Sequence, residues 1–256
     1  MSKKTSIVST RRSKEIAKLY ELRILADYIE EELDCEKVQV HISPDIEKAY
    51  LILIQCSEKL DNRSIDELIN ELNLLQWSSN TLLITYDSHY SFAYYSEDLI
   101  MNRILRYITH EIIDDFRESL KSFIHNAFDK EIEYLFILHR KGEWLILEGE
   151  KYRINIPRIN DVIASIHTHP TSSCIPSRAD LESMIDLLTS GGVLFGIVSR
   201  TCLFTAELIN FINEYTYERL MRLLNNYDDF IQFLKRASGD VIRIGEDLIL
   251  KVRYKI

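Results

Sequence analysis

The sequence has few glycines and prolines and lacks a long apolar run. Its 7 Gly and 4 Pro among 256 residues predict a compact chain with short loops. The longest apolar run, around YLILI at residues 50–54, is far shorter than the roughly 20 residues that span a bilayer. No apolar stretch follows the basic residues near Met1, so we expect no signal peptide and no membrane association.

Cysteine is also scarce. The four cysteines are Cys35, Cys56, Cys174 and Cys202. They lack the paired spacing of a structural zinc site or of a small disulfide-rich domain. We therefore expect no disulfide framework, and a reducing, cytoplasmic location.

Positive charge is in the minority, and the formal net charge of −9 argues against a general affinity for nucleic acid. The N-terminal region is the exception, because six basic residues lie within its first eighteen: Lys3, Lys4, Arg11, Arg12, Lys14 and Lys18. We expect a flexible, solvated tail here. The alternative is a contact with nucleic acid or a partner.

Residues 1–96 alternate between helical and strand patterns. Apolar residues recur with helical spacing over 14–33 and 64–75, where Ser64 and Glu67 fit a capping box. Strands are expected at 37–42, 49–56, 80–86 and 90–96. This region holds no cluster of reactive residue types. We interpret it as a small α/β accessory domain that recognises substrate, covers a cleft, or mediates homo- or hetero-oligomerisation.

Residues 97–256 predict a larger α/β domain of the α+β type. Isoleucines at 100, 104, 108 and 112 begin a stripe that predicts one long helix to residue 124, bridging the two parts. A hairpin over 131–148 has Gly142 in its turn, and a strand follows at 161–169. The remaining elements expected are a helix at 178–190 ended by Gly191, a strand at 193–199, a helix at 213–236, and strands at 240–244 and 248–254.

The stretch SIHTHPTSSCIPSRADL, residues 165–181, contains the residues with the clearest pattern of candidate metal ligands. Because strand side chains alternate between faces, His167 and His169 point to the same side. Pro170 ends the strand, and the loop leads to a helix with Asp180 in its first turn. Two imidazoles and one carboxylate are three ligands, and a tetrahedral zinc ion would keep its fourth position for water, as catalytic zinc does.

Each half of this motif also has a reading without metal. Ser177 and Asp180 fit a helix N-cap with an acidic residue at the third helical position. His167 and His169 alone could be ordinary surface or partly buried histidines. The combination in one strand–loop–helix context favours a metal site, and capping and ligation are compatible.

HTHPTSSCIPSRAD resembles the His-x-His-Pro-x6-Ser-x-x-Asp signature of the JAMM (MPN-plus) zinc metalloproteases, and the order of elements over roughly 100–256 is similar as well. The resemblance implies a mixed β-sheet flanked by helices. It also implies zinc ligands at His167, His169 and Asp180, and a serine, Ser177, that stabilises the developing oxyanion. It implies cleavage of an amide or isopeptide bond at the C-terminus of a ubiquitin-like or sulfur-carrier protein. The first 96 residues lie outside it.

The same resemblance implies a glutamate general base near the start of the first hairpin strand. Glu131 and Glu133 are candidates that would share a strand face. Glu133 is preferred, because Leu135 and its neighbours then fall where the family has buried residues. Glu131 remains the first alternative, followed by Glu143 and Glu148. The family's glycines near this glutamate are bulky residues here, so local packing must differ.

Other metal-ligating residue types fit the site less well. Cys174 as a fourth ligand would close the site to water, and we interpret it as a bystander thiol. The remaining histidines, at 41, 89, 110, 125 and 139, share no ligand spacing with one another.

Three functions follow. The first is a zinc-dependent isopeptidase or peptidase. The second is a non-catalytic interaction scaffold, which would have no need of the ligand set. The third is a zinc amidohydrolase for small molecules.

Overall fold

Two β-sheets and seven helices make up the residues that a computed structural model describes, namely 5–43, 47–56, 65–78, 80–87, 101–150, 159–236 and 241–254. The larger sheet has the strand order β1-β6-β5-β7-β8-β9-β11-β10. Its strands are β1 Thr5–Val8, β5 Tyr134–His139, β6 Glu143–Glu148, β7 Val162–Thr168, β8 Leu194–Val198, β9 Cys202–Leu208, β10 Val241–Ile244 and β11 Leu248–Tyr254. The smaller sheet has the order β2-β3-β4, with β2 Cys35–Ile42, β3 Ala49–Cys56 and β4 Leu82–Asp87.

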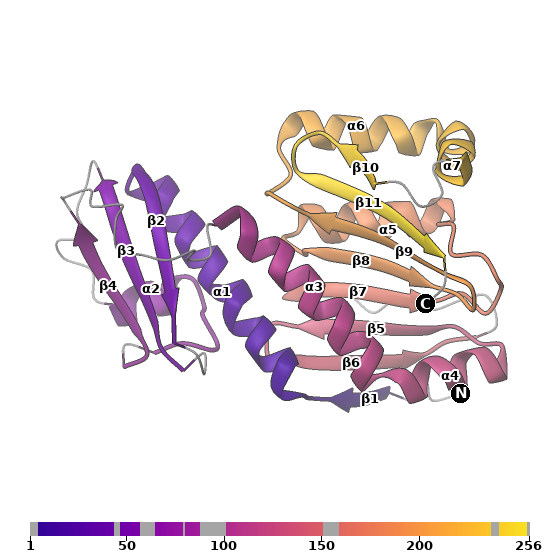
Figure 1. Ribbon diagram of the computed structural model, residues 1–256, viewed down its shortest axis with the longest axis horizontal. Coiled ribbons are helices and arrows are strands. Elements are labelled where there is room, and N and C mark those ends of the chain that lie inside the picture. Colours follow the sequence, from indigo (N-terminus) through magenta and orange to yellow (C-terminus); the bar gives the residue numbers. More distant parts are fainter. Residues whose placement is uncertain are drawn as a thin grey trace.

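The helices cover both faces of the larger sheet (Figure 1). They are α1 Arg11–Glu32, α2 Ile65–Glu71, α3 Met101–Ser119, α4 Lys121–Lys130, α5 Arg178–Thr189, α6 Glu214–Asn225 and α7 Tyr227–Arg236. Helices α1 and α3 lie on one face, and α5 packs against β7 and β8 on the other, with α6 beside α5 and β10. The small sheet lies beyond α1, so α1 stands between the two sheets.

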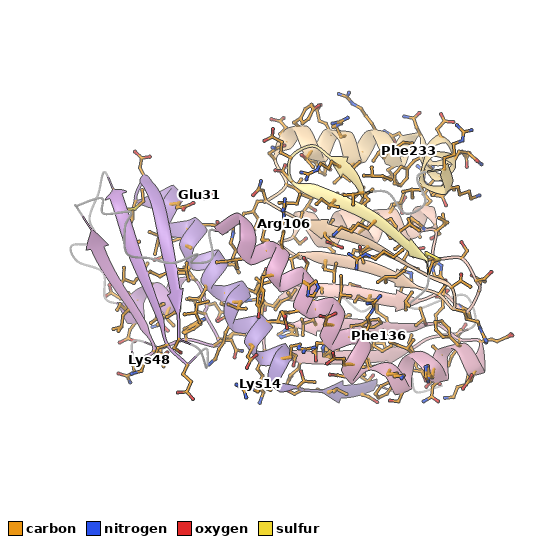
Figure 2. All side chains as sticks on the ribbon, in the orientation of Figure 1. Lys14, Glu31, Lys48, Arg106, Phe136 and Phe233 are labelled. Carbon is orange, nitrogen blue, oxygen red and sulfur yellow. A yellow bond between two sulfur atoms is a disulfide. The ribbon has the colours of Figure 1, made fainter. Side chains whose placement is uncertain are left out.

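The fold is a mixture of helices and mostly antiparallel strands, which confirms the α+β class. Among the described strands of the larger sheet, β7 and β8 run parallel and the other neighbours run antiparallel. Large apolar side chains fill the space between α3 and the sheet. The rings of Phe116 and Phe136 meet edge to face with centroids 5.1 Å apart, and Trp144 packs against Phe116. Figure 2 labels Phe136 at this layer, whereas Phe233 of α7 is half exposed.

The N-terminal region is ordered secondary structure, so the expectation of a flexible tail is wrong from Thr5 onward. Strand β1 pairs with β6, and Thr10 caps α1 by accepting a hydrogen bond from the Ser13 N–H at 2.8 Å. Four of the six basic residues, from Arg11 to Lys18, belong to α1, where Arg12 pairs with Glu111 and Glu118 of α3. Lys3 and Lys4 lie outside the described residues. The N-terminal basic cluster is therefore partly neutralised within the protein.

Helix α1 ties the N-terminal residues to both sheets. It packs against α3, β6 and β2. The hairpin turn approaches it so closely that a Cβ on Gly142 would lie 2.7 Å from Lys14 Cα. The Ser13 hydroxyl donates to the Gly142 carbonyl at 2.7 Å, and the Tyr20 hydroxyl donates to the Gly191 carbonyl at 2.9 Å. The predicted boundary at residue 96 stays a prediction, but β1 and α1 lie in the framework of the larger sheet.

A buried ion pair joins the small sheet's connections to the larger sheet. Glu21 of α1 accepts hydrogen bonds from the Leu75 and Gln76 N–H groups at 2.8 Å each. Arg140, in the turn after β5, approaches Glu21 at 3.4 Å and donates to the Asn73 carbonyl at 3.0 Å. Such a junction needs every partner, because an unpaired buried charge is strongly destabilising.

Two predicted helices are each divided in the structure. The helix expected to reach residue 124 breaks at Leu120, between α3 and α4; the Ser119 hydroxyl bonds the Asp115 carboxylate at 2.7 Å, and Leu120 is fully buried. The helix expected over 213–236 breaks at Asn226, whose side chain donates to the Arg222 carbonyl at 2.9 Å. Apolar periodicity continues across both breaks, so the stripe alone does not reveal them. The strand expected at 90–96 and the cap at Ser64 lie outside the described residues.

All four cysteines form disulfides, which corrects the expectation that no disulfides are present. Cys35 is bonded to Cys56, its neighbour across β2 and β3, and Cys174 is bonded to Cys202 at the start of β9. Their sequence separations of 21 and 28 residues carry no sign of this proximity, which arises from strand pairing and loop packing. Scattered cysteines therefore no longer support a reducing compartment.

The described helices are too short or too polar for a membrane span, since none of them combines sufficient length with sufficient apolar character to cross a bilayer. A cytoplasmic location stays a prediction.

The Asp115 carboxylate, which is 1% exposed, joins α1, α3 and β6. It accepts hydrogen bonds from the Thr10 hydroxyl at 3.0 Å and the Trp144 indole N–H at 2.8 Å. We predict that Asp115→Ala lowers the free energy of unfolding by about 3 kcal/mol, because it leaves buried donors without an acceptor. Urea denaturation measures this loss. The matched control Asp114→Ala, on the more exposed side of α3, should cost less than about 0.5 kcal/mol, and equal losses would refute the assignment.

Candidate metal centre

Strand β7 places two histidines on one side of the larger sheet. His167 lies opposite Leu135 of β5 and Ile197 of β8. The His169 N–H still donates to the Val198 carbonyl at 2.8 Å, so the strand geometry continues for one residue after Thr168. Because side chains alternate, His167 and His169 project from the same face. His167 is buried, and the ring centroids of the two histidines lie 4.9 Å apart.

Helix α5 brings the carboxylate. Ser177 is its N-cap and has extended backbone geometry; the hydroxyl accepts from the Asp180 N–H at 3.2 Å, and the Asp180 carboxylate accepts from the Ser177 N–H at 2.7 Å. This is the capping box that the sequence allowed. It also fixes the side chain of Asp180 in the first turn, so the cap itself orients the candidate ligand.

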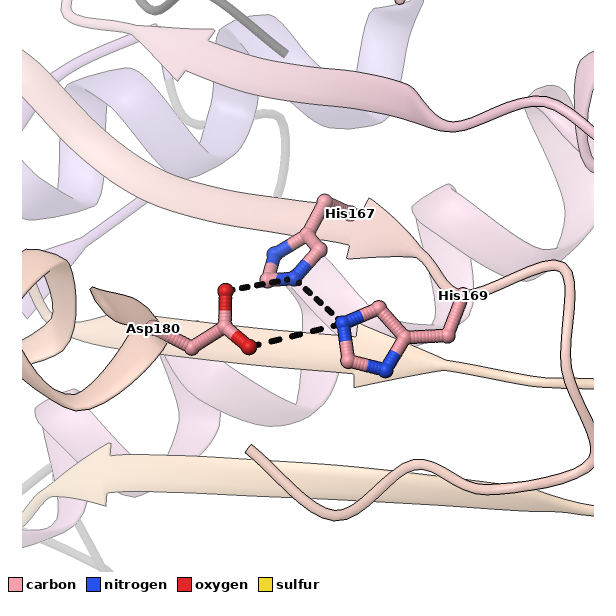
Figure 3. A group of neighbouring side chains, drawn as sticks. All are labelled: His167, His169 and Asp180. Atoms are coloured by element: carbon pink, nitrogen blue, oxygen red, sulfur yellow. Dashed lines mark hydrogen bonds and ion pairs between the residues drawn. The ribbon is translucent and has the colours of Figure 1, made fainter. Parts of the chain in front are cut away.

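The three side chains converge on one point (Figure 3). The Nε2 atoms of His167 and His169 are 3.1 Å apart, and the Asp180 oxygens lie 3.2 Å from the first and 3.4 Å from the second. For zinc bonds of about 2.1 Å, the edge of a tetrahedron is about 3.4 Å. Oδ1 of Asp180 faces His167 and Oδ2 faces His169, so each separation is close to such an edge, but the two carboxylate distances belong to different oxygens. In the described part of the chain, these residues are the group whose ligand atoms could hold a metal ion together.

Hydrogen bonding orients the second imidazole toward this point. His169 Nδ1 lies 3.3 Å from the Ser173 carbonyl, which can only accept, so Nδ1 carries the proton of a neutral ring. In this neutral form, which is the one that binds a metal, Nε2 keeps its lone pair and directs it at the site. A partner on the remote nitrogen is a common feature of metal-binding histidines, because it fixes the tautomer and the ring plane.

The charges of the site stabilise each other. Burial alone would raise the pKa of Asp180, but hydrogen bonds from His167 and His169 outweigh it and hold that pKa well below its usual range. Burial alone would lower the pKa of His169, but the adjacent Asp180 and the charge of Glu133 raise it above its ordinary value. The site thus favours a positive charge between these groups, which a bound cation can supply.

Glu133 lies beside the three candidate ligands. It extends the pairing of β5 with β6, since its N–H donates to the Glu150 carbonyl and its own carbonyl accepts from the Gly149 N–H. Two residues before Leu135, it shares the face of His167. Burial raises the pKa of Glu133 to about 7; His169 lowers this pKa, and Asp180 raises it. A carboxyl group with such a pKa can both take and return a proton near neutral pH.

The alternative glutamates occupy other surroundings. Glu131 is the left-handed C-cap of α4, with φ 51°, so it does not share a strand face with Glu133 as expected. Glu143 pairs with His139 at the far end of the hairpin. Glu148 accepts a hydrogen bond at 2.6 Å from Tyr134, which alternates with Leu135 and so lies on the opposite face.

The structure also resolves the role of Cys174. It is completely buried and bonded to Cys202, so it is neither a bystander thiol nor a fourth ligand. The bond attaches the loop between His169 and Asp180 to the beginning of β9. The Ser199 hydroxyl adds a hydrogen bond to the Ser172 carbonyl at 3.3 Å. The loop is thus fixed by a disulfide bond and by a hydrogen bond to its backbone.

One residue that supports the loop before Asp180 was not predicted from the sequence. The Tyr227 hydroxyl of α7 donates to the Pro176 carbonyl at 2.9 Å, directly before the Ser177 cap. Burial raises the pKa of Tyr227, and the charge of Asp180 raises it further, which shows that Tyr227 lies near the site. A tyrosine 47 positions after Asp180 has no local signature, and only the packing of α7 reveals it.

Among the other histidines, His110 and His125 are exposed, and His139 accepts from the Lys141 N–H at 3.1 Å. His89 and the side chain of His41 lie outside the described residues. Comparisons of the chain with models of known protein families, with characterised proteins and with solved structures found no match.

Zinc binding should compete with a proton on His169. Because the pKa of His169 is raised, its ring holds a proton at higher pH than an ordinary histidine does, and zinc must displace that proton. We predict that zinc affinity falls about tenfold per pH unit below this raised pKa, while Asp180 stays ionised. Titration calorimetry in two buffers of different ionisation enthalpy measures the released proton.

The matched control for this titration is His110→Ala, which removes an exposed imidazole of α3 and should leave the pH dependence unchanged. A zinc affinity that does not change with pH would contradict the expected proton displacement.

Proposed function

We propose that this protein is a zinc-dependent hydrolase that cleaves an amide or isopeptide bond at the C-terminus of a ubiquitin-like or sulfur-carrier protein. The observation that carries the proposal is the cluster of His167, His169 and Asp180, whose facing nitrogen and oxygen atoms lie 3.1–3.4 Å apart, beside a carboxyl group of raised pKa. Two neutral nitrogens and one carboxylate are a ligand set typical of catalytic zinc, which keeps a position for water.

In this proposal the chain's own residues divide the chemistry. A bound zinc ion would acidify a water molecule and polarise the substrate carbonyl. Glu133 takes the water's proton and passes it to the departing amine, a cycle suited to its pKa of about 7. Ser177 is exposed next to Asp180 and can donate its hydroxyl proton to the negative oxygen that develops on the carbonyl, since its cap bond uses the hydroxyl as an acceptor.

The identity of the substrate comes from the resemblance of HTHPTSSCIPSRAD to the JAMM signature. The site lies at the end of strand β7. An extended C-terminal tail could present a single amide bond to a metal there while the rest of the substrate stays folded. Intact ligands favour catalysis over a scaffold, which would gain nothing from paired imidazoles directed at each other.

The test combines metal content with cleavage of a ubiquitin-like fusion protein. We predict that Glu133→Gln keeps stoichiometric zinc and lowers kcat by about 10²- to 10⁴-fold, because the base is lost and the ligands are not. His167→Ala should lose the metal as well as the activity. Elemental analysis and a cleavage time course measure both.

The matched control is Glu131→Gln, two residues away at the C-cap of α4, which should retain activity within about twofold. Full activity in Glu133→Gln together with loss in Glu131→Gln would reverse the assignment of the base. Stoichiometric zinc without any cleavage would favour the scaffold instead.

A further inference from the structure

A pocket of about 770 Å³ lies between α5 and the strands β5 and β7. Ile137 and Ser165, which are partners across β5 and β7, line it. The next pair on the same face is Leu135 and His167. Because same-face residues are two positions apart, this lining begins about 7 Å from the position of the first histidine ligand.

Helix α5 forms the other wall. Ser183 and Leu187 line the pocket and follow Asp180 by three and seven positions, so all three share one side of the helix. Ser190, at the end of α5, also lines it, about 15 Å from Asp180 at the helical rise of 1.5 Å per residue. The pocket is therefore a trough that extends away from the metal centre along α5. An extended peptide of about four residues has this length.

The lining of the trough combines apolar and acidic groups. Ile137, Val162 and Leu187 supply apolar surface, whereas Asp161 and Asp186 supply carboxylates. The Asp161 carboxylate forms an ion pair with the Arg140 guanidinium at 3.4 Å. Asp186 is exposed and has no ion-pair partner among the described residues. Asp186 follows Asp180 by about 9 Å along the helix, the length of about three extended residues.

We propose that this trough binds the extended chain that leads to the scissile carbonyl, and that Asp186 selects a lysine or arginine about three residues before that carbonyl. This inference rests on the proposed hydrolase function. The acyl side of the substrate enters the trough, because a protein C-terminus offers continuous main chain there, whereas the amine side of an isopeptide is a lysine side chain. Charge complementarity with Asp186 favours a basic occupant over a neutral or acidic one.

The test measures binding of fluorescein-labelled pentapeptides that end in a free glycine carboxylate. Three peptides differ only three residues before that glycine, where they carry Lys, norleucine or Glu. Anisotropy titrations use the full-length protein, both zinc-loaded and metal-free. Asp186→Lys is compared with Glu182→Lys, which makes the same charge change on an exposed position of α5 outside the trough.

Wild type should bind the Lys peptide about fivefold more tightly than the norleucine peptide. Asp186→Lys should reverse the ranking in favour of the Glu peptide, and Glu182→Lys should keep the wild-type ranking. The inference is overturned by equal affinities of wild type for Lys and norleucine, by the same ranking in both variants, or by no measurable binding of any peptide.

Failure of the proposed function gives a different result. A protein without zinc or without cleavage of the fusion refutes hydrolysis, while the ranking in the metal-free protein still reports on the trough. Conversely, zinc-dependent cleavage with no effect of Asp186→Lys on the ranking refutes only the selection of a basic residue.

Discussion

The pairing register of β5 with β7 is the constraint on which the candidate site depends. Leu135 lies opposite His167, so Glu133 and His169 extend from the same face of neighbouring strands. A slip of one residue would turn His167 toward the side occupied by Ile166, where α3 packs. The buried residues on both faces oppose such a slip, since Phe136 is enclosed by Phe116 on the helical side. Ordinary core packing thus fixes the position of the polar groups.

The carboxylate depends on a second, independent set of contacts. Asp180 is oriented by the α5 cap, and the loop before it is attached through Cys174 to β9 and through Tyr227 to α7. Each contact removes freedom that the loop would otherwise lose when an ion binds. The three side chains already lie close enough together to hold one ion, so little rearrangement is needed for ligation.

Local patterns predicted much of the structure, because alternation and capping depend on near neighbours. The positions of β2, β3, β7 and α5, the turn at Gly142 and the convergence of His167, His169 and Asp180 all follow from short-range rules. Strand β1 has only four residues, and β9 is buried throughout and lacks alternation, so neither gave a strand signal.

The remaining errors concern contacts between distant parts of the chain. The bonds Cys35–Cys56 and Cys174–Cys202 and the anchoring of Pro176 by Tyr227 depend on tertiary packing, which sequence spacing does not encode. The left-handed C-cap at Glu131 also replaced the expected strand, because α4 ends there. The trough beside α5 could not be predicted either, since it is formed by segments from three elements.

Helix α1 holds the two sheets together, so a protein that lacks it would expose surfaces that are now covered. It contributes to the cores of both sheets, receives the hairpin turn at Gly142 and contacts the end of α5 through Tyr20. Removing α1 together with β1 would uncover α3 and leave the outer edge of β6 without its partner, a surface prone to intermolecular strand pairing. The larger sheet therefore depends on residues 5–32 to cover this edge and α3, although these residues contribute no ligand to the candidate metal centre.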